Sequence, residues 1–152
     1  MELDSKGYTL VELIAVMAIL ALLAAIAMPA GNRMLAAMRL ESDATQIAAL
    51  LRLARSEAIT TGQPSTVVFY TSSAKYKLLG SNYQYLNSGI RFIGSTSFTS
   101  KLNGLPICGF SPLGAPTSGG TVTLSNGFER CYVIVNPVVG RIRVSSSPPG
   151  IE

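Results

Sequence analysis

The stretch that decides the fold is residues 6–28, which read KGYTLVELIAVMAILALLAAIAM. From Tyr8 to Met28 the only side chain expected to carry a charge is that of Glu12. This run is 21 residues long, and about 20 apolar residues suffice to span the hydrocarbon core of a bilayer as an α-helix. The sequence therefore predicts a membrane-spanning helix over residues 8–28.

The composition of the 152-residue chain excludes several classes of protein. Only 13% of the residues are charged, against about 25% in a typical soluble domain. The chain has no histidine and two cysteines, so it lacks the usual general base and the usual zinc ligands. Carboxylates are nearly absent beyond residue 62, which argues against a two-carboxylate hydrolase site. We therefore expect no enzyme activity, no metal site and no cofactor.

Two simple interpretations of the N-terminus leave some of its residues unexplained. A secretory signal peptide would have its apolar core at residues 13–23 and a small-residue cleavage site at residues 25–27. Its leading segment should be basic, yet this one holds two acidic residues and a single lysine. A plain membrane anchor accounts for the apolar run but not for Glu12, because an acid deep in a membrane helix costs about 2.5–3.5 kcal/mol.

The segment Lys6-Gly7-Tyr8-Thr9-Leu10-Val11-Glu12-Leu13 resembles the prepilin cleavage motif of type IV pilins and pseudopilins. A short leader ends in Gly7, an aromatic residue follows, and the acid is the fifth residue after the leader. Pro29 falls at the twenty-second position, where this family commonly has a proline. The resemblance implies cleavage between Gly7 and Tyr8 by prepilin peptidase and N-methylation of Tyr8. Tyrosine is less common than Phe or Met at that position.

The same resemblance gives Glu12 a role in assembly. In this family the acid is thought to pair with the N-terminal amine of a neighbouring subunit, and a buried carboxylate is tolerable when it is paired. Glu12 lies four residues after Tyr8, about one helical turn, so it could set the register between subunits. The alternative is an acid that merely lies at the headgroup level, where it costs little.

The resemblance also implies a location for the chain. It implies a single-pass protein of the cytoplasmic (inner) membrane, surrounded by lipid before assembly, with its C-terminal domain outside the cytoplasm. The chain would then enter a filament in the periplasm or at the cell surface.

Beyond Pro29-Ala30-Gly31, which we expect to interrupt or bend the helix, a helical pattern resumes near Asn32. Apolar residues recur every three to four positions up to Ala58 and form one stripe, while Asp43 and the other charged residues mostly lie off it. Gly62 is a plausible C-terminal cap. Residues 29–62 are therefore predicted to be an amphipathic continuation of the helix that packs on the following sheet.

From Pro64 onward the hydrophobic period changes towards two, which is typical of strands separated by turns. The predicted strands are Thr66–Tyr70, Tyr76–Leu79, Ile90–Ile93, Thr121–Leu124, Tyr132–Val135 and Arg141–Val144. Residues 103–120 hold many glycines and prolines, so we expect a loop there with at most one short strand. The expected fold is α+β, with the long N-terminal helix packed on an antiparallel sheet. Its parts are a leader (1–7), a membrane helix (8–28), an amphipathic helix (29–62) and a β-rich domain (63–152).

Three further segments resemble the GspH/FimT-like minor pilins, the pseudopilin H branch. They are residues 53–59, residues 109–114 followed by 120–124, and residues 139–144. This resemblance implies a minor subunit that joins other pilins or pseudopilins and helps to initiate or cap a filament. A type IV pilus, a type II secretion pseudopilus and a competence pseudopilus all remain open.

A second possible function is DNA binding. Residues 63–152 hold seven basic and two acidic side chains, a net charge of +5. Arg141 and Arg143 would share one face of a strand and suit phosphate contacts, and FimT-like minor pilins of DNA uptake carry a similar Gly-Arg-x-Arg sequence. Lys75, Lys77 and Arg130 could join this patch if the fold brings them near. The alternative is a pair of arginines that guards an edge strand against pairing.

Cys108 and Cys131 would naturally form a disulfide in an exported domain. Closing that loop would stabilise the fold by roughly 3 kcal/mol on the chain-entropy argument. The alternative is two separate buried thiols.

Overall fold

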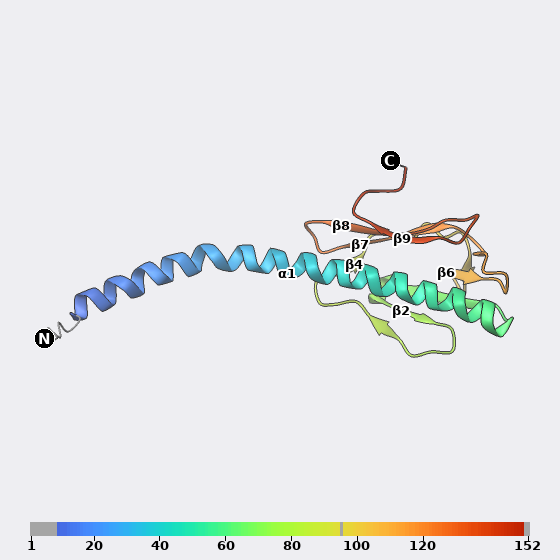
Figure 1. The fold of residues 1–152 in the computed structure, drawn as a ribbon, viewed down its shortest axis with the longest axis horizontal. Coiled ribbons are helices and arrows are strands. Elements are labelled where there is room, and N and C mark those ends of the chain that lie inside the picture. Colours follow the sequence, from blue (N-terminus) through green and yellow to red (C-terminus); the bar gives the residue numbers. More distant parts are fainter. Residues whose placement is uncertain (1–8, 95, 151–152) are drawn as a thin grey trace, which may run out of the picture. The chain divides into compact units, whose positions relative to one another are not determined.

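The computed structural model describes residues 9–94 and 96–150, with only the backbone described for residues 26–30. The helix α1 covers Leu10–Thr61 and is followed by nine strands (Figure 1). The chain divides into two compact units, Met1–Leu35 and Ala36–Glu152. The second half of α1 therefore belongs to the same unit as the strands, which we call the head.

The start of α1 is capped by a side chain next to the predicted cleavage site. The backbone N–H of Glu12 donates to Oγ1 of Thr9 at 3.2 Å, and the N–H of Leu13 donates to the Thr9 carbonyl at 3.2 Å. A Thr followed three residues later by a Glu has the spacing of a capping box. An acid in the first turn also interacts favourably with the helix dipole.

Of the two outcomes predicted for Pro29, an interruption or a bend of the helix, the interruption is wrong, because the helical backbone continues through residues 29–31. A proline removes a single backbone donor, and helical residues continue on both sides of it. Within the part of the chain that is described, no helix reaches the length and apolarity that a membrane crossing requires.

The C-terminal end of α1 confirms the predicted cap. The helix ends at Thr61, and Gly62 follows with a φ of 68°, a left-handed conformation that glycine adopts without strain. Thr61 Oγ1 donates to the Glu57 carbonyl at 2.7 Å, and Ser65 Oγ donates to Oε2 of the same glutamate at 3.0 Å. The last turn is thus tied to the first strand.

Two antiparallel sheets make up the rest of the head. The first sheet has the order β3-β2-β1-β6-β5 and the second has the order β4-β7-β8-β9. The strands of the first sheet are β1 (Ser65–Tyr70), β2 (Lys75–Leu78), β3 (Gln84–Tyr85), β5 (Lys101–Leu102) and β6 (Leu105–Phe110). Those of the second sheet are β4 (Arg91–Phe92), β7 (Gly120–Ser125), β8 (Arg130–Val135) and β9 (Ile142–Ser145). A short 3₁₀ turn, η1 (Thr71–Ser73), joins β1 to β2.

The six predicted strands are all present. Most of their ends differ from the predicted ends by one residue, and β8 begins two residues earlier than predicted, at Arg130. Residues 103–120 were expected to be a loop with at most one short strand, and one strand, β6, is present there. It is six residues long and pairs with β1 from Ser65↔Phe110 to Val68↔Ile107. Its proline, Pro106, lies opposite Lys101 of the two-residue strand β5. Proline is tolerated near a sheet edge, and the remaining β6 residues alternate towards the core.

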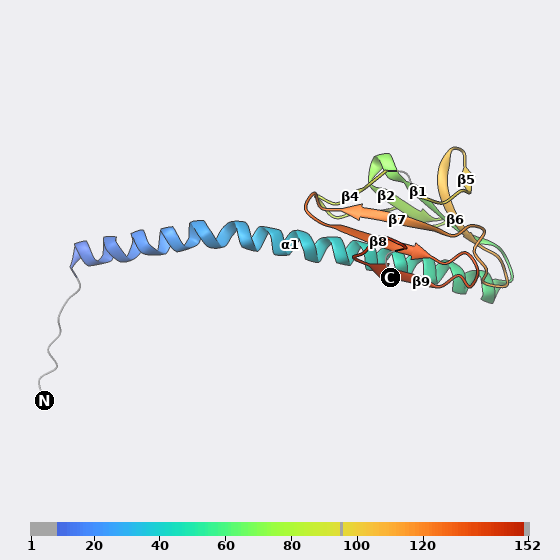
Figure 2. The same ribbon diagram turned by 90° about the horizontal axis from the view of Figure 1, so that it is seen from above.

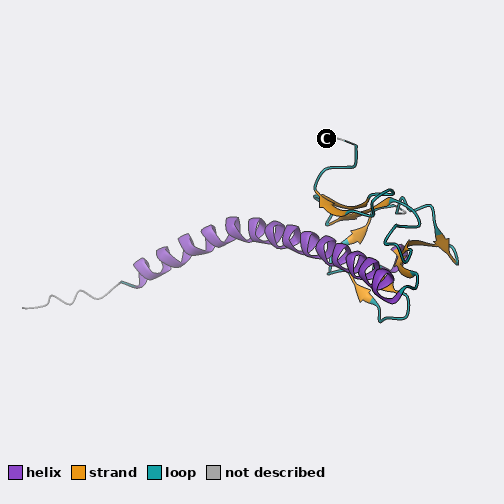
Figure 3. Cartoon of the chain, turned by 45° about the vertical axis from the view of Figure 1, so that its right-hand side comes forward, coloured by secondary structure: helices purple, strands orange, loops and turns teal. Residues whose placement is uncertain are grey.

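One core joins the helix and both sheets, and Figures 2 and 3 show strands of both sheets flanking the head portion of α1. The helix contributes a buried stripe from Leu40 to Ala58 that includes Ile47 and Leu51. The predicted stripe began near Asn32, but Met34 and Met38 are 67% and 58% exposed, so only its later part is buried. Phe69 of β1 stacks on Phe98 with ring centroids 5.7 Å apart, and it meets Phe92 of β4 edge-on at 6.4 Å. These aromatic contacts pack the two sheets against each other. The fold is α+β, as predicted.

Asp43 is an exception to the expected solvent-facing charges of the helix. It is only 1% exposed, and its two carboxylate oxygens accept hydrogen bonds from the backbone N–H of Asn87 at 2.9 Å and from Nδ2 of Asn87 at 2.7 Å. Burial raises the pKa of Asp43 above 3.8, against the opposing effect of the Asn87 hydrogen bonds. A buried carboxylate therefore fastens the β3–β4 connection to the helix.

The predicted disulfide is wrong, since Cys108 and Cys131 are free thiols. Cys108 lies in β6 opposite Val67 of the first sheet, whereas Cys131 lies in β8 opposite Leu124 of the second. The Cys131 thiol donates to the Ser145 carbonyl at 3.6 Å. Burial raises the pKa of Cys108 to about 12, so this cysteine behaves as a small core residue.

Candidate assembly and anion-binding sites

The first half of α1 presents apolar side chains to its surroundings on every side. Its large apolar side chains from Leu10 to Leu23 are between 50% and 75% exposed. They are Leu10, Val11, Leu13, Ile14, Val16, Met17, Ile19, Leu20, Leu22 and Leu23. Glu12 is exposed beside them in the first turn. Gly7 and Tyr8, the predicted processing residues, lie outside the described residues, and Pro29 is described by its helical backbone alone.

The structure brings Arg141 and Arg143 together at the start of β9. Both line a pocket of about 340 Å³ whose other walls are Ile134, Val135, Asn136 and Pro137. The turn before β9 is closed by a hydrogen bond from the Asn136 N–H to the Arg141 carbonyl at 2.9 Å. Arg143 lies opposite Ile134 of β8. Two guanidinium groups at one pocket suit an anion such as a phosphate.

Two helix arginines to which the sequence assigned no contact, Arg52 and Arg55, hold this region in place. Arg55 donates from Nε to the Gly114 carbonyl at 3.0 Å and from Nη1 to the Gly140 carbonyl at 3.4 Å. Arg52 donates from Nη2 to the Ile142 carbonyl at 3.3 Å. Only the three-dimensional fold reveals these contacts, because their partners are 59 to 90 residues away in sequence.

Arg130 lies on the same face of the second sheet but at the other end of β8. It pairs with Ser125 of β7, which in turn pairs with Arg91 of β4. Cross-strand partners share a face, so Arg91 and Arg130 lie roughly 10 Å apart on it. Arg143 lies opposite Ile134, and Ile134 is four residues along β8 from Arg130. The backbone of Arg143 is therefore roughly 13 Å from that of Arg130. The sequence analysis missed Arg91, although its alternation with the buried Phe92 was a usable signal.

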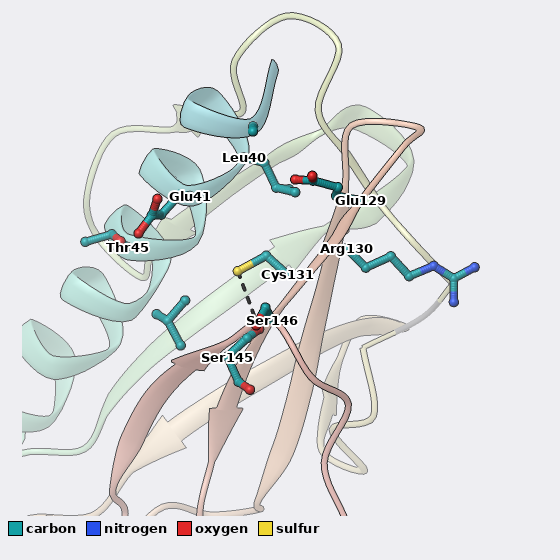
Figure 4. A pocket seen from close by; sticks show the side chains of 10 residues that line it. Leu40, Glu41, Thr45, Glu129, Arg130, Cys131, Ser145 and Ser146 are labelled. Carbon is teal, nitrogen blue, oxygen red and sulfur yellow. Dashed lines mark hydrogen bonds between the residues drawn. The ribbon is translucent and has the colours of Figure 1, made fainter. Parts of the chain in front are cut away.

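Beside Arg130, a larger pocket opens between α1 and the strands β8 and β9 (Figure 4). It has a volume of about 400 Å³, and its walls include Glu41, Thr45, Glu129, Cys131 and Ser145. In Figure 4 the Arg130 guanidinium extends away from Glu41 and the helix. With two carboxylates at its walls, this pocket is a poor site for an anion.

Lys75 and Lys77 do not join the arginines. They lie in β2 of the first sheet, where Lys75 pairs with Tyr70 and Lys77 pairs with Val68 of β1. Lys75 Nζ lies 4.2 Å from the ring centroid of Tyr83 and 5.3 Å from that of Tyr70. Lys77 Nζ lies 4.6 Å from the Tyr83 centroid. The basic side chains proposed for the patch are thus divided between the two sheets.

The tyrosines of the first sheet contact each other as well. The rings of Tyr70 and Tyr83 meet edge-on with centroids 5.4 Å apart. The pKa of Tyr83 is lowered by its hydrogen bond with Tyr70 and by the nearby ammonium groups of Lys77 and Lys75, while the pKa of Tyr70 is raised by the same hydrogen bond. In the described part of the chain, no cluster of three or more His, Cys, Asp or Glu residues is placed to hold a metal ion.

Comparison with known proteins identifies the family of this chain. The sequence model of the family described as Type II transport protein GspH matches residues 43–146, and that of the prokaryotic N-terminal methylation motif matches residues 4–28. The chain is 31% identical over 140 residues to the Type II secretion system protein H of Xanthomonas campestris pv. campestris, a match that covers 91% of this chain and 82% of that protein.

Solved structures share the fold. The minor pseudopilin EpsH from the Type 2 Secretion System of Vibrio cholerae aligns with a TM-score of 0.56 and 17% identity, covering 74% of this chain and 98% of that one. The type IV minor pilin FimU of Pseudomonas aeruginosa aligns with a TM-score of 0.54 and 14% identity, covering 70% of this chain and 87% of that one. The family match over most of the head and the methylation motif over the start of α1 confirm the resemblance seen in the sequence. The chain therefore belongs to the GspH family of type II transport proteins, and it is a minor pseudopilin or minor pilin.

Proposed function

We propose that this chain is cleaved between Gly7 and Tyr8 by prepilin peptidase and joins or initiates a type II secretion pseudopilus through the first half of α1. The observation that supports this proposal is the exposed apolar surface from Leu10 to Leu23. A surface of this kind must be covered by lipid or by other protein. Inner-membrane lipid would cover it before assembly and neighbouring pseudopilin helices would cover it afterwards, with the head outside the cytoplasm.

Glu12 fits both states. In the free chain it lies in the capped first turn of α1, where a negative charge is favourable. In the filament it would pair with the methylated amine of Tyr8 of a neighbouring subunit and fix the axial register.

Processing is tested by the intact mass of the chain extracted from membranes. We expect a chain that begins at Tyr8 and carries one additional methyl group. A chain that begins at Met28 would overturn the proposal in favour of an ordinary signal peptide.

The role of Glu12 is tested by filament entry. Glu12→Ala should remain membrane-inserted but fail to appear in sheared filaments. Thr9→Ala is the matched control, because it removes the cap at Oγ1 and keeps the carboxylate, so it should still enter filaments. Normal entry of Glu12→Ala, or equal loss in both variants, would refute the register role.

We also propose that the role is structural rather than catalytic. The chain has no histidine, and the pocket at Glu41 and Glu129 is open and lacks an activated nucleophile among its walls, since burial raises the pKa of the Cys131 thiol. Hydrolysis of an ester or of nucleic acid by the purified chain would contradict this.

DNA binding is the second candidate function, supported by the pocket that Arg141 and Arg143 share. The test is binding of a DNA duplex by the full chain in neutral detergent over a salt series. Arg141→Ala with Arg143→Ala should weaken binding at least about tenfold and lower the salt slope by about two. Lys101→Ala on the first sheet is the control and should change little. Absence of binding at low salt would exclude this function.

A further inference from the structure

The first sheet carries a surface that neither assembly through α1 nor the arginine pocket uses. We call it the Lys–Tyr surface, and it consists of Tyr70, Lys75, Lys77, Tyr83 and Tyr85. The cross-strand pairs Tyr70↔Lys75 and Lys75↔Tyr85 place these side chains on one face of β1, β2 and β3. Tyr83 lies just ahead of β3 and contacts both lysines.

The charge of this surface is unopposed. Between Glu57 and Glu129 the sequence contains no Asp or Glu, so none of the strands of the first sheet bears a carboxylate. A negatively charged group that approaches Lys75 and Lys77 therefore meets no repulsion from the sheet itself.

The two ammonium groups are held before any partner binds. Lys75 Nζ and Lys77 Nζ both lie over the Tyr83 ring, at 4.2 and 4.6 Å from its centroid. Such cation–π contacts restrict long side chains that otherwise lose entropy on binding. The Tyr70 ring meets the Tyr83 ring edge-on, with centroids 5.4 Å apart, and this contact restricts the Tyr83 ring in turn.

Apolar area surrounds the charges. Tyr85 is 65% exposed, and Leu79 in the turn after β2 is also largely exposed. Exposed tyrosines beside cations are typical of protein–protein contact surfaces, where aromatic residues are enriched.

We propose that the Lys–Tyr surface docks an acidic protein segment of a neighbouring subunit in the filament, an inference that rests on the proposed role as a filament subunit. The carboxylates of that segment contact Lys75 and Lys77, and its apolar atoms pack on Tyr85 and Leu79. An acidic peptide fits better than a single-stranded nucleic acid, because base stacking needs free ring faces and the Tyr83 ring already faces both ammonium groups.

The test uses the full-length processed chain in neutral-detergent micelles and a fluorescent decaglutamate peptide as the probe. We expect saturable binding by anisotropy that weakens with added salt. Lys75→Glu with Lys77→Glu should weaken it by about tenfold or more, since two attractions become repulsions. The control Lys101→Glu places one reversed charge on β5, at the opposite edge of the same sheet, and should leave binding within about twofold.

The contribution of the preorganised ring is tested by Tyr83→Leu, which keeps both lysines. We expect a loss of about threefold, because cation–π contacts at exposed sites contribute about 0.5–1 kcal/mol. Unfolding midpoints of all variants should match that of the wild type, which separates loss of docking from loss of folding.

Three results would overturn the inference. The first is that decaglutamate shows no saturable binding, and the second is that Lys101→Glu loses as much binding as the double variant. The third is that a single-stranded oligothymidylate binds tighter than decaglutamate and that this binding is lost in Lys75→Glu with Lys77→Glu. The filament assay keeps the two proposals apart. A wild-type chain that fails to enter filaments refutes the proposed function, whereas a chain that enters filaments but does not bind decaglutamate refutes only the docking surface.

Discussion

At the scale of single residues, two of the buried polar groups in the head, the Asp43 carboxyl and the Tyr76 hydroxyl, differ in their hydrogen bonding. Asp43 is buried but satisfied by two hydrogen bonds from Asn87. The Tyr76 hydroxyl is buried and has no hydrogen-bond partner in the described part of the chain. Burial, followed by the charge of Asp43, raises the pKa of Tyr76 to about 12. Buried polar groups without a partner are costly, so the two residues respond oppositely to substitution.

Tyr76→Phe should leave the free energy of unfolding unchanged or raise it by up to about 1 kcal/mol, because it removes a buried hydroxyl that makes no bond. Urea titration of the full chain in detergent measures this. Phe69→Ala is the contrasting variant and should lower the free energy of unfolding by about 3–5 kcal/mol. A marked loss in Tyr76→Phe would mean that the hydroxyl has a partner in solution.

Asp43 gives a pH dependence with a defined sign. Its pKa is raised above 3.8 by burial, so just above that pH the folded chain keeps a proton that the unfolded chain releases. The stability that this protonated form provides is present at low pH and is lost as the pH rises through the raised pKa.

The measurement is the free energy of unfolding of the wild type and of Asp43→Asn between roughly pH 3 and pH 7. Relative to Asp43→Asn, the wild type should lose stability as the pH rises over this range. The opposite slope would show that the Asn87 hydrogen bonds outweigh burial.

At the scale of elements, one helix side chain positions two loops. Arg55 donates to the carbonyls of Gly114 and Gly140, and a Cβ on Gly140 would come within 2.9 Å of the Gly114 carbonyl oxygen. Close packing against Gly114 therefore explains why a glycine stands at position 140 of the Gly-Arg-x-Arg sequence, whether or not the chain binds DNA.

Gly140→Ala should lower the free energy of unfolding by about 1–3 kcal/mol, because it combines a positive φ with a close approach. Gly127→Ala is the matched control. Gly127 also has a positive φ but has open space around it, so it should cost only about 1 kcal/mol. Chemical denaturation compares the two, and an equal cost would mean that the Gly140 loop moves to accept the methyl group.

The elements that the sequence predicted correctly are those with a strong period. The amphipathic half of α1, its Gly62 cap and the strands around Val67 and Val133 follow from residue spacing alone. The strand β6 was allowed for but not located, because Pro106 and the nearby glycines are typical of loops. The sequence leaves the continuity of α1 through Pro29 open between an interruption and a bend, because a proline predicts a helix boundary only on average.

At the scale of the whole molecule, the sequence could not predict how charges distribute between two sheets. Lys75, Lys77 and Arg143 are all basic residues on strands, but which of them meet depends on strand order and register. The sequence placed Arg141 and Arg143 together because they are two residues apart. Whether Lys75 lies near these arginines depends on the order of the strands. The observed order places Lys75 and Lys77 in the other sheet.

The cysteines lead to a prediction at this scale, since the two sheets are joined by packing and not by a disulfide. The melting temperature should be the same with and without a reducing agent. Cys131 lines the pocket beside α1 and should be alkylated before Cys108, which is fully buried. Mass spectrometry after timed alkylation measures this, and a reductant-sensitive melting temperature would contradict it.

The absence of carboxylates between Glu57 and Glu129 has one more consequence. That stretch also lacks histidine, so it holds none of the side-chain types that ordinarily titrate between mildly acidic and neutral pH. The Lys–Tyr surface therefore contains neither a carboxylate nor an imidazole. We therefore expect any pH response of docking in that range to come from the carboxylates of the partner rather than from the Lys–Tyr surface.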